Sequence, residues 1–214
     1  SGAVISVKEA GKVQQAVFEW AIGLGHQVAN RVLEGKPVPM GLRLRYRLGR
    51  LLALDNIRRL IGIHRARFLF VGGAPTAPDL IRWYLALGVP MIEGWGQTES
   101  GGMSTFFTPR HLRPGTIGPA APYNEVRVDP TTGELLVRGP NVFMGYLNQP
   151  EKTAETIDPD GWLHTGDVGV QLEDGCFRIT DRIKDIIITA GGKNVTPSEI
   201  ENELKFSPYI TDSV

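Results

Sequence analysis

Residues 94–102 bring together the side-chain types that a ligand site needs. This stretch, Gly-Trp-Gly-Gln-Thr-Glu-Ser-Gly-Gly, offers an indole ring for stacking, hydroxyl and amide groups for hydrogen bonds, and one carboxylate. The apolar run at residues 89–92 precedes it and is typical of a short buried strand. Open α/β sheets bind ligands in loops at the carboxyl ends of parallel strands. The stretch therefore predicts a ligand-binding loop.

A second glycine-containing turn is predicted to lie beside this loop. Residues 67–71 are typical of a strand, which the turn Gly-Gly-Ala-Pro at 72–75 ends. Residues 79–87 have helical periodicity and lead to the strand at 89–92. Because a strand–helix–strand unit favours a right-handed parallel crossover, both turns should meet at one edge of the sheet and form one site.

The residues before this unit are predicted to be helical and include a strongly basic stretch. Apolar residues recur every three to four positions between 4 and 34, which indicates one or two amphipathic helices. Eight arginines follow between positions 42 and 67, where Asp55 is the only acid. The stretch could bind phosphate groups or anionic lipid heads, or it could be a solvated face beside a leucine-rich one.

The second half of the chain is predicted to form short antiparallel strands. Two hairpins are expected, at residues 126–137 and 168–179, each with glycine in its turn. Residues 161–167 are expected to form a polar turn between them. We therefore predict an α/β fold: a mostly parallel sheet with flanking helices, then a small β-barrel, then the start of a small α+β domain.

The bulk composition excludes several classes of protein. Lys plus Arg and Asp plus Glu number 23 each, so no net charge favours nucleic acid. The single cysteine, Cys176, excludes an internal disulfide framework. Four histidines show no zinc-ligand spacing, and we interpret His164 as structural. No signal peptide or membrane-spanning run is present in the sequence, so we expect a cytoplasmic protein, with membrane association left open.

Four separated segments, taken in order, resemble one enzyme family. They are Gly-Gly-Ala-Pro at 72–75, Gly-Trp-Gly-Gln-Thr-Glu-Ser at 94–100, Trp-Leu-His-Thr-Gly-Asp at 162–167, and the run from Asp181-Arg-Ile-Lys-Asp to Glu201. The chain resembles adenylate-forming acyl-activating enzymes over about residues 40–214. Residues 145–148 and 188–197 resemble the long-chain fatty acid–CoA ligases among them. This resemblance implies that a fatty acid is activated with ATP as an acyl-adenylate, and that CoA thiol then displaces AMP.

The resemblance also implies a role for each matched residue. Gly73, Ala74 and Pro75 would approach adenine through their backbone, and Trp95 between Gly94 and Gly96 would stack on the purine. Gln97 and Thr98 would contact the α-phosphate, with Thr98 and Glu99 as the catalytic pair, and Glu99 would hold Mg²⁺. Asp167 would bind the ribose hydroxyls, and Arg182 would reach ribose or phosphate. Taken singly, each of these residues has an ordinary interpretation as a core aromatic, a surface charge or a turn residue.

The C-terminal segment is predicted to contain a hinge and a CoA-binding turn. Lys184 matches the family's hinge position, where a domain rotation would present the site to CoA. Gly191, Gly192 and Lys193 would line the channel for the pantetheine arm of CoA. We therefore expect residues 1–180 to be part of the large AMP-binding domain, divided at 105/106 into sheet and barrel parts. Residues 181–214 are expected to hold the hinge and the start of the small domain.

Two elements of the family pattern have no match in this sequence. One is the Ser/Thr/Gly-rich loop for the β- and γ-phosphates, and the other is a lysine near the far C-terminus. We therefore expect a fragment of a fatty acid–CoA ligase that is inactive as an isolated chain. Two alternatives stay open: an adenylation domain that stops at the adenylate or loads a carrier protein, and a non-catalytic nucleotide-binding module. Chain length of the acid and oligomeric state are not readable from the sequence.

Overall fold

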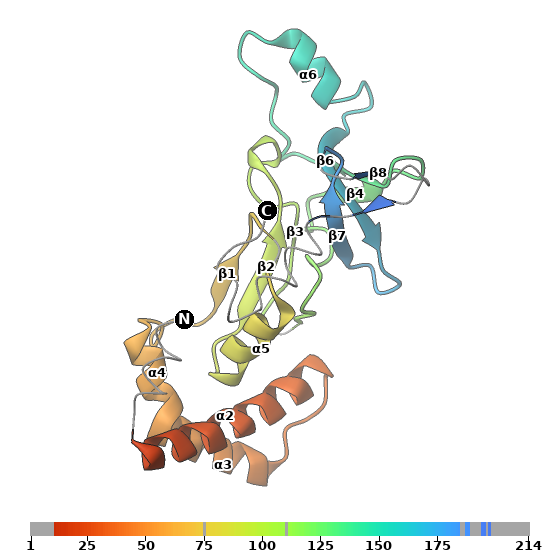
Figure 1. Cartoon of the computed structure of the whole chain (residues 1–214). Helices are drawn as coiled ribbons and strands as arrows, with labels where there is room; N and C mark the ends of the chain where they lie inside the picture. The colour runs from red at the N-terminus through yellow and green to blue at the C-terminus, as the bar shows by residue number, and fades with distance from the viewer. Residues whose placement is uncertain are drawn as a thin grey trace. The chain divides into compact units, whose positions relative to one another are not determined.

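The computed structural model describes residues 11–74, 76–109, 111–184, 187–188, 194–195 and 197. Pro75 and the predicted CoA-binding residues Gly191, Gly192 and Lys193 lie outside the described residues, as does most of the helix expected at 196–206. The elements of the described part are drawn in Figure 1.

The chain divides into two compact units that are not continuous in sequence. One unit contains the residues up to Val71 together with Pro78–Ile92 and Thr108–Pro114. The other contains Gly72–Ala77, Glu93–Phe107 and the chain from Gly115 onward. The chain passes between the two units several times. The domain bounds expected from the sequence stay a prediction.

Helices dominate the first unit. Its elements are α2 (Lys12–Leu33), α3 (Met40–Gly49), the π-helical turn η1 (Arg50–Leu54), α4 (Asp55–Leu60) and α5 (Pro78–Ala86). Ala21, Leu54, Ile57 and Leu87 form one buried cluster, and Ala29, Leu85 and Ala86 form another. Small residues allow the close packing: a Cβ on Gly49 would lie 3.1 Å from the Cβ of Ala21. The helices expected at 4–34 and 79–87 are thus confirmed over their described residues.

Residues 42–60 of the basic stretch lie in α3, η1 and α4. Its single acid, Asp55, accepts hydrogen bonds from Arg50 and Arg58 through Oδ1, at 3.1 and 3.0 Å. Arg58 is buried, whereas Arg43, Arg45 and Arg47 are exposed on α3. Arg58 is therefore part of the packed structure, whereas these three arginines are open to solvent, and their binding of phosphate or lipid heads stays a prediction.

A short three-stranded sheet has the order β1–β2–β3. Strands β1 (Leu69–Val71) and β2 (Met91–Trp95) are joined through α5, as the strand–helix–strand pattern predicts. Strand β3 (Thr105–Phe106) pairs antiparallel with the end of β2, with Gly94 opposite Phe106 and Trp95 opposite Thr105. Gly94 and Trp95 therefore belong to a strand. The loop predicted at 94–102 begins later, at Gly96.

A four-stranded antiparallel sheet occupies the second unit, in the order β4–β5–β6–β7. Its strands are β4 (Glu125–Val128), β5 (Glu134–Arg138), β6 (Leu163–Gln171) and β7 (Phe177–Arg182). Both predicted hairpins are confirmed. The polar turn expected at 161–167 is wrong in part, because Leu163 onward belongs to β6. Leu135, Val137, Leu163 and Phe177 pack with Trp95 in one buried cluster.

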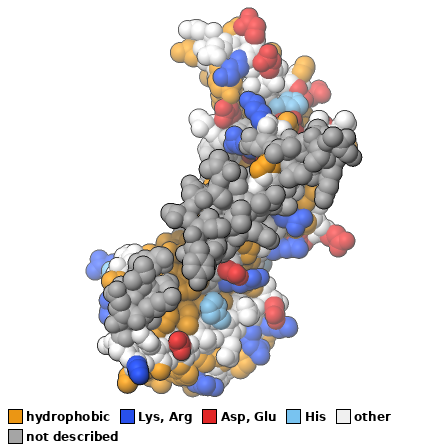
Figure 2. All heavy atoms as spheres, viewed as in Figure 1, with side chains coloured by type: hydrophobic (Ala, Val, Ile, Leu, Met, Phe, Trp, Pro, Cys, Tyr) orange, Lys and Arg blue, Asp and Glu red, His pale blue; other side chains and the backbone are white. Residues whose placement is uncertain are grey.

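Among its described residues, the second unit also contains a short helix and a two-stranded sheet. Helix α6 (Pro150–Thr156) lies between β5 and β6 in sequence, and β8 (Ile187–Ile188) pairs antiparallel with β9 (Asn194–Val195). Basic and acidic side chains are interspersed on the face shown in Figure 2. Within the described residues, no helix combines the length and apolar character that a bilayer crossing requires.

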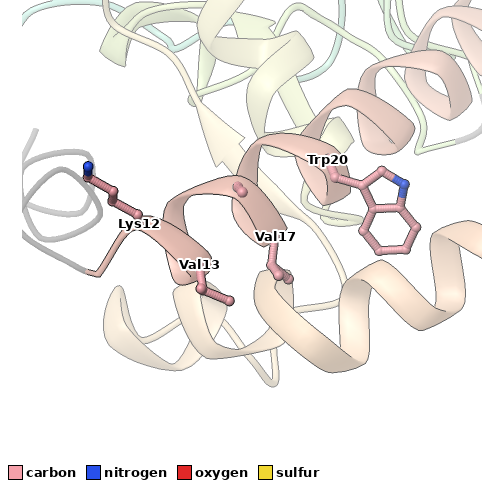
Figure 3. A pocket seen from close by; sticks show the side chains of 5 residues that line it. Lys12, Val13, Val17 and Trp20 are labelled. Atoms are coloured by element: carbon pink, nitrogen blue, oxygen red, sulfur yellow. The ribbon is translucent and has the colours of Figure 1, made fainter.

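One apolar hollow of about 410 Å³ lies along the start of α2. Val13, Val17 and Trp20 project from one side of this helix (Figure 3), and Lys12 and Ala16 complete the lining. None of the residues predicted to bind nucleotide lines it. The described residues predicted to bind nucleotide belong to the second unit.

Candidate functional site

The loop after β2 is closed by its own hydrogen bonds. Ser100 is fully buried, and its Oγ accepts from the Gln97 amide at 3.0 Å and donates to the Gln97 carbonyl oxygen at 3.1 Å. The amide of Gly102 also donates to the Gln97 carbonyl, at 3.1 Å. The short 3₁₀ helix Thr98–Ser100 lies inside this closure, with the Thr98 side chain exposed. The loop thus presents the Thr98 hydroxyl to solvent on a fixed backbone.

Two glycines make this closure possible. A Cβ on Gly96 would lie 2.0 Å from the carbonyl oxygen of Gly102, so no side chain fits there. Gly101 adopts φ +64°, a left-handed conformation that glycine reaches without strain. The Gly-x-x-x-x-Gly spacing from 96 to 101 is therefore a steric requirement of the turn.

Glu99 is held from both its backbone and its side chain. The phenol of Tyr146 donates to Glu99 Oε1 at 2.7 Å, and the amide of Phe143 donates to the Glu99 carbonyl oxygen at 2.8 Å. This bond to Glu99 raises the pKa of the Tyr146 phenol. Among the described residues, no hydrogen bond to the other carboxylate oxygen, Oε2, is present. Within this part of the chain, Oε2 is therefore the carboxylate oxygen that is open to a ligand.

The register of the four-stranded sheet brings Asp167 and Arg182 together. They lie directly opposite each other on β6 and β7. Arg182 Nε lies 3.1 Å from Asp167 Oδ1, and the two side chains form an ion pair. The aspartate side chain is 9% exposed and the arginine side chain is 66% exposed. Asp167 therefore holds the Arg182 guanidinium through Nε, and most of the arginine side chain faces solvent. Two of the predicted site residues thus form one charged unit.

Trp95, on β2, contacts the Asp167–Arg182 pair. Its indole Nε1 donates to Asp167 Oδ2 at 2.7 Å, across 72 residues of sequence. The residue is only 7% exposed and packs in the buried cluster of the four-stranded sheet. In this conformation the indole presents little surface to a purine, and its stacking role stays a prediction. What the geometry adds is that Trp95 fixes the second oxygen of Asp167.

The Thr-Gly-Asp segment that carries Asp167 is shaped by neighbours on β5. Thr165 Oγ1 donates to the Leu135 carbonyl oxygen at 2.6 Å, and the Gly166 amide donates to Glu134 Oε1 at 2.8 Å. His164 Nδ1 lies 3.0 Å from Glu134 Oε2, in keeping with its structural interpretation. Gly166 has φ +74°. Buried Glu134, which sequence reasoning missed, thus holds the His164–Gly166 part of β6 in place.

The glycine turn before α5 is open. Gly73 has φ +84°, and a Cβ built there meets no atom within 4 Å. Gly72, Gly73 and Ala74 are all exposed. The described backbone of this turn is therefore accessible, and the adenine contact expected for Gly73 and Ala74 stays a prediction.

Glu93 is a buried acid that links two loops of the second unit. It precedes Gly94 on β2 and is 9% exposed, and the backbone amides of Thr76 and Gly115 donate to its side chain. Burial raises its pKa from 4.5 to about 7, because removal from water disfavours the charged carboxylate. Thr76 directly follows the glycine turn at 72–75, so Glu93 ties the end of this turn to the strand that leads into the Gly96–Gly102 loop. Its neighbours in sequence gave no sign of this role.

We expect Glu93→Gln to remove a pH dependence of stability. The folded protein keeps a proton on Glu93 up to about pH 7, whereas the unfolded chain releases it near pH 4.5. The wild-type protein should therefore lose up to about 3 kcal/mol of folding free energy between pH 4.5 and pH 7, and the glutamine variant should not. Urea unfolding at pH 5 and pH 8 measures this difference. Exposed Glu173→Gln is the control, and parallel pH profiles of wild type and Glu93→Gln would rule out the effect.

The family of the chain follows from comparison with known sequences. The sequence profile described as "AMP-binding enzyme" matches residues 27–147, which is more than half of the chain. The chain belongs to the AMP-binding enzyme family. The matched range contains the glycine turn, Glu93, the Gly96–Gly102 loop and Tyr146.

Curated relatives agree with this membership. The chain is 38% identical over 212 residues to the long-chain-fatty-acid–CoA ligase ACSBG2 of Gallus gallus, covering 96% of the chain and 27% of the relative. It is 39% identical over 171 residues to the long-chain-fatty-acid–CoA ligase ACSBG1 of Rattus norvegicus, covering 78% and 24%. The chain thus spans about a quarter of the length of these AMP-binding relatives.

Solved AMP-binding structures share the fold. O-succinylbenzoate coenzyme A synthetase from Bacillus subtilis, in complex with ATP and magnesium ion, matches 68% of the chain and 32% of its own length, with a TM-score of 0.63 at 28% identity. MatB from Rhodopseudomonas palustris, with ATP bound, matches 68% and 31%, with a TM-score of 0.61 at 39% identity. These matches agree with the α/β class of the chain.

The donor set of the site fits a magnesium–nucleotide complex and does not fit a self-contained metal centre. Among the described residues, no group of three or more His, Cys, Asp or Glu side chains could hold a metal ion. Mg²⁺ commonly binds through one or two carboxylates plus substrate phosphates and water, so a single carboxylate with one free oxygen is sufficient. Glu99 meets this description.

Proposed function

We propose that the chain is the nucleotide-binding part of an ATP-dependent fatty acid–CoA ligase. The observation that carries the proposal is the convergence of matched residues in one unit: Glu99 on its closed loop, the open turn at Gly73, and Asp167 paired with Arg182. The names of the relatives, long-chain-fatty-acid–CoA ligases, support the fatty acid as substrate.

In this proposal each element handles one part of ATP. The exposed backbone at Gly73 and Ala74 contacts the adenine edge, and Asp167 accepts hydrogen bonds from the ribose hydroxyls. Each carboxylate oxygen has two lone pairs, so Asp167 can bind ribose while it keeps Trp95 and Arg182. Arg182 reaches toward ribose or phosphate with its exposed nitrogens.

The chemical step is placed at Thr98 and Glu99. The fatty acid carboxylate attacks the α-phosphorus, the bond to pyrophosphate breaks, and negative charge builds on the α-phosphate oxygens. The exposed Thr98 hydroxyl and the Gln97 side chain donate hydrogen bonds to that charge from a fixed backbone. Glu99 would hold Mg²⁺, which would supply neutralisation of the phosphate charge.

The test measures both half-reactions on the full-length protein. We expect fatty acid-dependent exchange of labelled pyrophosphate into ATP, and formation of acyl-CoA when CoA is added, with long-chain acids preferred in a chain-length panel. Exchange without acyl-CoA would favour an adenylation domain with another acceptor. Nucleotide binding without exchange for any acid would reject ligase activity and leave a non-catalytic nucleotide-binding module.

We also propose Lys184 as the hinge between the two half-reactions. It is exposed and lies two residues beyond the end of β7. Lys184→Pro fixes φ near −65° and so restricts a backbone rotation there. We expect it to retain pyrophosphate exchange within about threefold and to lower acyl-CoA formation by at least about tenfold. Lys184→Ala is the control for the side chain, and an equal loss of both half-reactions would count against the hinge.

A further inference from the structure

Tyr146 and its surroundings form a clamp around Glu99. The Tyr146 phenol donates to Glu99 Oε1 at 2.7 Å, and the backbone amide of Phe143 holds the Glu99 carbonyl at 2.8 Å. The rings of Phe143 and Tyr146 meet edge to face, with centroids 4.9 Å apart. Two successive contacts from one segment therefore fix both ends of the glutamate.

Helix α6 in turn fixes this segment. The amide of Tyr146 donates to Thr153 Oγ1 at 2.9 Å, and Thr153 Oγ1 donates to the Gln149 carbonyl oxygen at 2.9 Å. Gly145 has φ +140°, and a Cβ there would lie 2.5 Å from Thr153 Cγ2, so only glycine allows the approach. The backbone at Tyr146 is thus held in place by α6, the helix that follows it in sequence.

Lys152 of the same helix covers the tyrosine ring. Its Nζ lies 4.4 Å from the ring centroid, within the range of a cation–π contact. The Tyr146 side chain is thus contacted by the Phe143 ring, by the Lys152 ammonium over its face and by Glu99 at its hydroxyl. The side chain has little freedom to point its phenol elsewhere.

We propose that Tyr146 is a positioning residue that orients Glu99 for Mg²⁺. The proposal rests on the proposed role of Glu99. The phenol occupies Oε1 and so leaves Oε2 as the oxygen for the metal. Hydrogen bonds to metal-ligating carboxylates fix their orientation, and loss of such a partner typically costs 10–100-fold in metal affinity.

The test uses Tyr146→Phe, which removes one oxygen and keeps the ring contacts. In the full-length protein with a non-hydrolysable ATP analogue, binding of Mn²⁺ in place of Mg²⁺ is followed by the loss of its free-ion electron paramagnetic resonance signal. We expect the apparent Kd for Mn²⁺ to rise about tenfold. The Mg²⁺ concentration for half-maximal pyrophosphate exchange should rise in parallel, while the rate at saturating Mg²⁺ recovers to within about threefold.

Controls separate this inference from the proposed function. Tyr123→Phe removes an exposed phenol whose bond to the Met103 carbonyl is long, at 3.4 Å, and should change neither value. If Glu99→Gln weakens Mn²⁺ binding and Tyr146→Phe does not, the positioning role is rejected and the metal role of Glu99 stands. If Glu99→Gln also leaves Mn²⁺ binding unchanged, both are rejected. In the Glu99→Gln background, Tyr146→Phe should add no further loss, and an additive loss would contradict the clamp.

Discussion

Glu99→Gln in the full-length protein should lower pyrophosphate exchange by about 100-fold or more at saturating ATP. Glutamine has the shape of glutamate and an amide oxygen that can still accept from Tyr146 at the position of Oε1. The loop should therefore keep its fold, while the anionic ligand that Mg²⁺ prefers is lost. The variant should therefore be slow in the adenylation step, in which negative charge develops on the phosphate.

The measurement for Glu99→Gln is exchange rate against Mg²⁺ concentration, together with urea unfolding. Unchanged stability with a lost rate is the expected combination. Glu151→Gln, an exposed acid at the start of α6, is the matched control. Exchange within a factor of two of wild type would refute the role of Glu99 as a metal ligand.

Asp167→Ala is expected to lower both stability and nucleotide affinity. The substitution leaves the buried Trp95 Nε1–H without its acceptor and removes the partner of Arg182. An unsatisfied buried donor costs about 1–3 kcal/mol, and the empty space adds to this, so we expect a loss of about 2–4 kcal/mol. Affinity for AMP should fall by about tenfold or more, because two ribose hydroxyls lose a charged acceptor.

Two companion variants separate the two effects of Asp167. Trp95→Phe removes the indole donor and keeps the carboxylate, so stability should fall while AMP affinity changes much less. Asp167→Asn keeps an oxygen for Trp95 and loses the charge, so AMP affinity should fall while most stability remains. Urea unfolding and calorimetric AMP titration give the two quantities. Wild-type AMP affinity in Asp167→Asn would exclude the ribose role.

Much of the fold was readable from local sequence patterns. Helix α5 followed from apolar periodicity between two turns, and the hairpin of β4 and β5 from alternation on either side of Asp129–Gly133. These elements depend on neighbours close in sequence. The ligand-site residues followed from the resemblance of four ordered segments, since Asp167 or Arg182 alone looks like an ordinary polar residue.

The errors arose where a distant partner decides the structure. Gly94 and Trp95 looked like the start of a loop, yet β3 pairs with them from ten or more residues downstream. Leu163–Asp167 looked like a turn because glycine and polar residues interrupt it, yet pairing with β5 and β7 makes it a strand. Tyr146, Glu134 and Glu93 were missed for the same reason. Tyr146 lies 47 residues from Glu99, and no local pattern connects the two.

The bond between Trp95 and Asp167 also makes one of the four tryptophans an internal optical reporter. An indole whose N–H is held by a buried carboxylate emits according to the electric field at that bond. Any ligand that draws charge from Asp167 changes this field without displacing the ring. On the proposed ribose role of Asp167, nucleotide binding should change the intrinsic fluorescence of Trp95 and so be measurable without a label.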